Sequence, residues 1–163
     1  MIPLFCFKSL LNFLNVDLST TNEILHPKIN SWTAHLFRTD NKNCIIFLHH
    51  KSHFYFVIFG VKKDDYTKLN ELFLEGLITE LKKCFSINSF QENLLRSKFK
   101  GIQIHPKSNY NIANNYISSL ITTLKGIQSL ENYGNEVPLE EYYEKHNIFN
   151  EDWILKELDN LFN

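Results

Sequence analysis

Three consecutive runs rich in aromatic and β-branched residues constrain the fold of this 163-residue chain most strongly. Only short polar segments separate them. The runs are residues 31–38, 44–50 and 53–59. The polar segments between them are residues 40–43 and 51–52. Short polar separators between such runs are typical of β-hairpins. They predict a three-stranded antiparallel meander that ends at Gly60.

Both faces of this meander are largely apolar, so we expect other elements to cover both. The expected register pairs Arg38 near Cys44 and His50 near His53. One face then carries Trp32, Ala34, Leu36, Ile46, Leu48, Tyr55 and Val57. The other face carries His35, Phe37, Ile45, Phe47, Phe54, Phe56 and Ile58. A register shift of one residue would move the side chains of a strand to the opposite face.

Apolar residues at helical spacing on the C-terminal side of the meander predict two long helices, over residues 65–85 and 109–130. Two short strands are predicted over residues 2–7 and 101–105. Shorter helices are predicted over 10–14, where Ser9 is the expected N-cap, and over 89–98, 139–146 and 151–162. One domain is the default for this length. We therefore expect a single α+β domain, residues 1–163. Its core is a small antiparallel sheet packed by the two long helices (1–130), and an acidic helical C-terminal extension follows (131–163).

Charge is nearly balanced in total and uneven along the chain. Seventeen Lys and Arg against 18 Asp and Glu give a net charge of −1, which excludes steering by a whole-molecule field. Residues 82–107 nevertheless carry six bases and one acid, whereas residues 131–163 carry nine acids and two bases. The two segments are either neighbouring solvated faces of one fold or contact surfaces for different partners. The residues we expect to bind are Arg96, Lys98, Lys100, Lys107, Tyr142, Tyr143 and Trp153.

Two histidines of the meander are the catalytic candidates. In the expected register His35 and His49 share a sheet face on adjacent strands, with Cβ atoms about 5 Å apart. His50, His53 and His105 widen the choice. No spacing such as H-E-x-x-H indicates a metal centre, and the sequence predicts neither a metal nor a cofactor. Ordinary hydrogen-bonded histidines are the alternative interpretation.

The three cysteines, Cys6, Cys44 and Cys84, indicate neither a disulfide framework nor a zinc site, because their number is odd and no C-x-x-C occurs. A nucleophilic pair of Cys44 with His35 or His49 lacks any supporting motif, so we expect a small buried side chain there. Reduced cysteines fit a cytoplasmic location. The apolar N-terminus, residues 1–14, lacks a basic n-region and is interrupted by Lys8, so we expect neither a signal peptide nor a membrane span.

The segment Ser-Trp-Thr-Ala-His-Leu-Phe-Arg at residues 31–38 resembles the W-x-A-H-L-F signature of an uncharacterised bacterial family, a domain of unknown function. The signature residues are Trp32, Ala34, His35, Leu36 and Phe37. The resemblance covers about residues 4–85. Beyond them the family often has an R-S-x-x-G-S-M-N-like stretch, where this chain has residues 108–115 without the Arg, Gly or Met. The resemblance implies domain limits and a bacterial, intracellular origin, and it implies no reaction.

These observations predict a non-enzymatic binding or regulatory protein that acts through protein–protein contact, in a mobile-element or phage-defence setting. One alternative is a small hydrolase or nuclease that uses His35 and His49. A second alternative is a nucleic-acid-binding module that uses residues 82–107. We expect a protein partner and no membrane.

Overall fold

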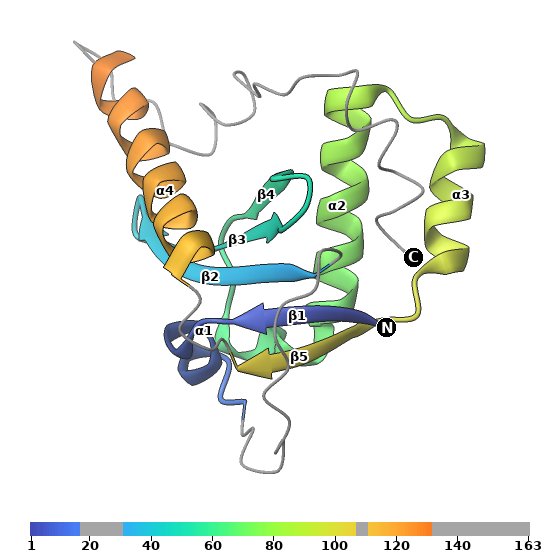
Figure 1. The fold of residues 1–163 in the computed structure, drawn as a ribbon, viewed down its shortest axis with the longest axis horizontal. Coiled ribbons are helices and arrows are strands. Elements are labelled where there is room, and N and C mark those ends of the chain that lie inside the picture. The colour runs from blue at the N-terminus through green and yellow to red at the C-terminus, as the bar shows by residue number, and fades with distance from the viewer. Residues whose placement is uncertain (17–30, 107–110, 132–163) are drawn as a thin grey trace.

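The structure is a computed structural model that describes residues 1–16, 31–106 and 111–131; side chains of the last helix are described for residues 115–125 (Figure 1). Its elements are β1 (Ile2–Cys6), α1 (Lys8–Phe13), β2 (Trp32–Thr39), β3 (Lys42–His49), β4 (Tyr55–Ile58), the 3-10 turn η1 (Lys63–Lys68), α2 (Leu69–Phe85), α3 (Ser89–Lys98), β5 (Ile102–Pro106) and α4 (Asn111–Glu131). The helices predicted over 139–146 and 151–162, and the C-terminal extension, lie outside the described residues.

The strands form one five-stranded sheet in the order β4-β3-β2-β1-β5. β2, β3 and β4 make the predicted antiparallel meander. β1 extends it by pairing parallel to β2 on one side and parallel to β5 on the other. The α+β class predicted from the sequence is confirmed, with a mixed sheet.

Helices cover both faces of this sheet, as its apolar faces require (Figure 1). On the α2 side, Phe73 of the helix packs among Trp32, Phe47 and Phe56 of the strands. On the α4 side, the helix places Ile117 and Leu124 against strand residues that include Phe37, Cys44, Ile46 and Leu48. The sheet is therefore the middle layer of three.

The register between β2 and β3 differs by one residue from the prediction. Arg38 pairs with Asn43 and not with Cys44. The cause is the turn, because Asp40 and Asn41 both adopt left-handed conformations (φ 47° and 59°) and close a two-residue hairpin loop. Trp32, Ala34 and Leu36 consequently share a face with Ile45 and Phe47, whereas Ile46 and Leu48 share the other with His35 and Phe37. The predicted register of β3 against β4 agrees with the pairing of Leu48 with Tyr55.

Two helix starts also differ from the sequence prediction. Phe7, and not Ser9, occupies the N-cap position of α1, with no capping side chain. The helix predicted over residues 65–85 is divided: its first residues belong to the 3-10 turn η1, and the α-helix begins at Leu69. At the start of η1 the Asp65 carboxylate accepts a hydrogen bond from the Lys62 N–H (2.7 Å).

Candidate functional site

His35 and His49 lie on opposite faces of the sheet. His49 pairs with Trp32 and packs against its ring on the α2 side, with ring centroids 5.1 Å apart. His35 pairs with Ile46 on the α4 side, where the Phe7 ring meets its imidazole edge-on at 4.4 Å. The prediction that the two share a face is wrong, because of the register difference at the β2–β3 turn. With the sheet between them, the two imidazoles cannot act on the same substrate atom.

His49 is part of the β3–β4 turn. Its side chain is fully buried, and its Nδ1 lies 2.6 Å from the Ser52 hydroxyl and accepts a hydrogen bond from the Ser52 N–H at 3.3 Å. The Ser52 hydroxyl oxygen also accepts a hydrogen bond from the Phe54 N–H at 3.2 Å. This imidazole therefore organises the backbone of the turn.

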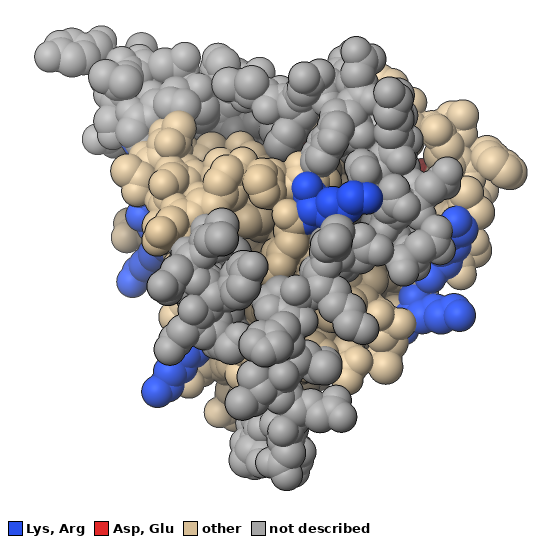
Figure 2. All heavy atoms as spheres, viewed as in Figure 1, with Lys and Arg blue, Asp and Glu red and all other residues tan. Residues whose placement is uncertain are grey.

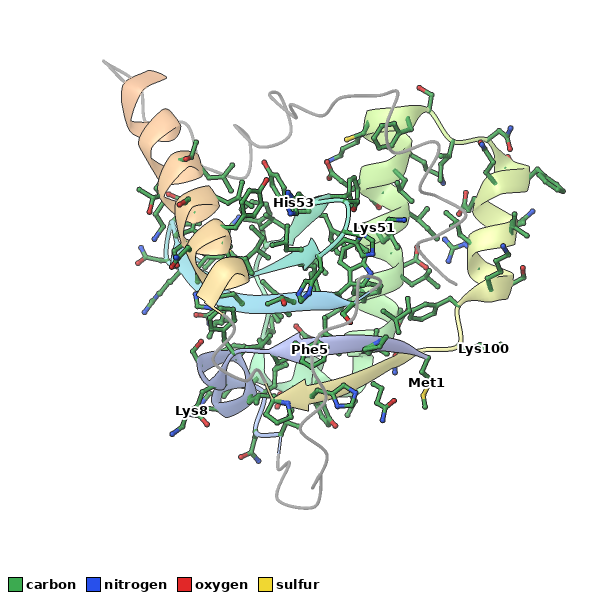
Figure 3. The ribbon with its side chains drawn as sticks, viewed as in Figure 1. Met1, Phe5, Lys8, Lys51, His53 and Lys100 are labelled. Carbon is green, nitrogen blue, oxygen red and sulfur yellow. The ribbon has the colours of Figure 1, made fainter. Side chains whose placement is uncertain are left out.

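The other histidines of the described part of the chain lie on or near the α4 side. The Phe5 ring on β1 (Figure 3) lies beside the rings of His50 and His105, at centroid distances of 6.3 and 5.3 Å. His50 also bonds to the Thr33 hydroxyl through Nε2. His53, at the β3–β4 turn, lies 4.8 Å from the Tyr116 ring of α4. Among the described residues no group of three or more His, Cys, Asp or Glu side chains is arranged to bind a metal ion.

All three cysteines are free thiols. Burial raises the pKa of Cys6 to about 12. Burial, together with the neighbouring Glu80 carboxylate, raises the pKa of Cys84 to about 12. Cys44 is buried, and its thiol donates to the Lys42 carbonyl at 3.7 Å. Because the thiolate is the nucleophile, these surroundings do not favour a nucleophilic cysteine.

We expect all three thiols to react slowly with iodoacetamide in the folded protein at neutral pH and rapidly in denaturant. Cys84 should react first, because its side chain is partly exposed whereas Cys6 and Cys44 are fully buried. Peptide mass spectrometry after timed labelling measures the order. Fast labelling of Cys44 under native conditions would contradict its burial.

Arg96, one of the predicted binding residues, lies in a cluster of ion pairs between α2 and α3. Its guanidinium binds both carboxylate oxygens of Glu75, and its Nη2 lies 2.8 Å from Glu92. Lys82 binds the other oxygen of Glu92 at 2.6 Å. These contacts lower the pKa of Glu75, mainly through Arg96, and the pKa of Glu92, mainly through Lys82. The charge of Arg96 therefore joins two helices within the fold.

Acidification should remove the contribution of this cluster. Because the folded pKa values of Glu75 and Glu92 lie below the ordinary 4.5, the stabilisation is present above about pH 4.5 and is lost as the pH falls through the lowered values. Arg96→Met should reduce the melting temperature at neutral pH, and the difference from wild type should shrink below pH 4.5. Lys98→Met, in the same helix, is the control and should show no such pH dependence.

The other predicted contact residues divide into two groups. Lys98 and Lys100 are exposed. Lys107, Tyr142, Tyr143 and Trp153 lie outside the described residues. On the face shown in Figure 2, the visible basic side chains stand apart and form no continuous patch. Nucleic-acid binding by residues 82–107 stays a prediction.

A groove runs between α2 and the outer edge of β4, with a volume of about 460 Å³. The strand side consists of Val57, Ile58 and Phe59. The helix side begins at Lys68, the last residue of η1, and continues along one stripe of α2 to Lys83. Gly76 lies in the middle of this stripe, where a Cβ would be only 2.9 Å from the Phe56 ring. The absence of a side chain at Gly76 therefore lets the helix approach the strand closely.

At Val57 the backbone of β4 points away from its partner strand β3. The His49 N–H donates to the Phe54 carbonyl at 2.8 Å. Because backbone groups of an antiparallel pair alternate in direction, those of Phe56 also point to β3, whereas the N–H and C=O of Val57 point away from it. Among the described residues no strand pairs with this edge.

The opposite edge of the sheet, at β5, is protected. The Ile102 N–H donates to the Asn70 side-chain oxygen at 2.7 Å, and Pro106 at the other end has no N–H. Natural sheets also protect their edges with charged side chains. β4 has neither a charge nor a proline, since its residues are Tyr55-Phe56-Val57-Ile58. The edge of β4 is therefore the better site for strand addition.

Residues 4–113 match the model of a domain of unknown function, DUF6933. The chain belongs to the DUF6933 family. This agrees with the uncharacterised domain family expected from the sequence; the W-x-A-H-L-F signature and the bacterial origin stay predictions. Neither the curated proteins nor the solved structures contain a match to the chain.

The part of the chain that matches DUF6933 contains the meander, α2, α3 and β5, so both walls of the groove lie within the family domain. No helix within the described ranges has the length and apolar character of a membrane span. The groove is not among the sites predicted from the sequence. The signal available was the uncharged, proline-free run at residues 54–59, followed by a helix whose apolar stripe contains Gly76.

Proposed function

We propose that this DUF6933 protein is a non-enzymatic binding module that acts through protein–protein contact, and that a partner binds along the edge of β4. The observation that carries the proposal is the edge of β4, which has neither a charge nor a proline and pairs with no further strand of the described residues, beside a groove (about 460 Å³). An extended segment added to a sheet edge gains main-chain hydrogen bonds, while neighbouring pockets select its side chains. β4 and α2 together offer both kinds of contact.

The opposite-face placement of His35 and His49 also favours binding over hydrolysis. A hydrolase or nuclease needs a general base and its orienting group within hydrogen-bond reach of each other or of one substrate. His49 instead holds the β3–β4 turn through Ser52. We further propose a cytoplasmic location in a bacterium, supported by three free thiols and by a chain without a disulfide framework.

Affinity purification with matched variants tests the proposal. Thr79→Trp places a large ring on the exposed groove side of α2, and Thr123→Trp makes the same change at an exposed site on α4. A protein retained by the wild type and by Thr123→Trp, but lost with Thr79→Trp, is the expected result. Retention of every captured protein by Thr79→Trp would exclude the groove as the contact surface, and capture of no protein would count against a binding function.

A further inference from the structure

We draw no further inference here: the strongest candidate, the side-chain cluster of Thr33, His50 and His105 on the α4 side of the sheet, carries none, because Thr33 and His105 are buried and nothing in the described part of the chain shows what ligand would reach them.

Discussion

Phe73→Ala is expected to lower the free energy of unfolding by about 3–5 kcal/mol, the range for truncating a buried phenylalanine. Phe73 is fully buried on α2, and its ring centroid lies 5.1 Å from that of Trp32, 5.3 Å from Phe47 and 5.5 Å from Phe56. These rings join α2 to the centre of the sheet. The loss combines the transfer of a large apolar side chain with a cavity that three aromatic neighbours cannot fill.

Phe90→Ala is the matched control for this prediction. Phe90 lies on α3 with 75% of its surface exposed, so the same substitution should change stability by no more than about 0.5 kcal/mol. Denaturant titration followed by circular dichroism measures both values. A change below about 1 kcal/mol for Phe73→Ala would contradict the packing of α2 on the sheet.

The sequence predicts the strands and helices well where local signals are strong. The meander follows from apolar runs that short polar segments separate. The helix α3 begins at a local capping signal, where the side chains of Asn88 and Gln91 bond to each other's backbone N–H. The register was not predictable, because residues 40–43 offer several turns and only the left-handed conformations of Asp40 and Asn41 select the two-residue loop. The one-residue difference in register shifts every residue of β2 relative to β3. It therefore places His35 and His49 on opposite faces of the sheet.

Longer-range features depend on neighbours that local patterns do not specify. The alternation at residues 101–105 predicts a strand, but nothing local indicates that β5 pairs parallel to β1. The groove likewise depends on the approach of α2 to Phe56 at Gly76. The predicted contact residue Arg96 illustrates the same limit, since its partner Glu75 is 21 positions away on another helix.

His49→Ala is expected to destabilise the protein by about 2–4 kcal/mol. The substitution leaves a cavity beside Trp32, and it leaves the Ser52 N–H and hydroxyl without their partner in the buried turn. A catalytic residue would behave differently, because its removal commonly spares or improves stability. The size of the loss therefore distinguishes an imidazole that builds the turn from one that does chemistry.

His53→Asn, in the same turn, is the control for this prediction. His53 is exposed and left-handed (φ 53°), a conformation that asparagine adopts readily, so we expect a change within about 0.5 kcal/mol. Ser52→Ala should lower the free energy of unfolding by part of the amount that His49→Ala does. The double variant His49→Ala with Ser52→Ala should lose less stability than the sum of the two single losses, because each substitution removes the same hydrogen bond. Thermal and denaturant unfolding measure the stability of all four variants. If His49→Ala is as stable as the wild type, the turn does not need this imidazole, and a chemical role for His49 becomes the better interpretation.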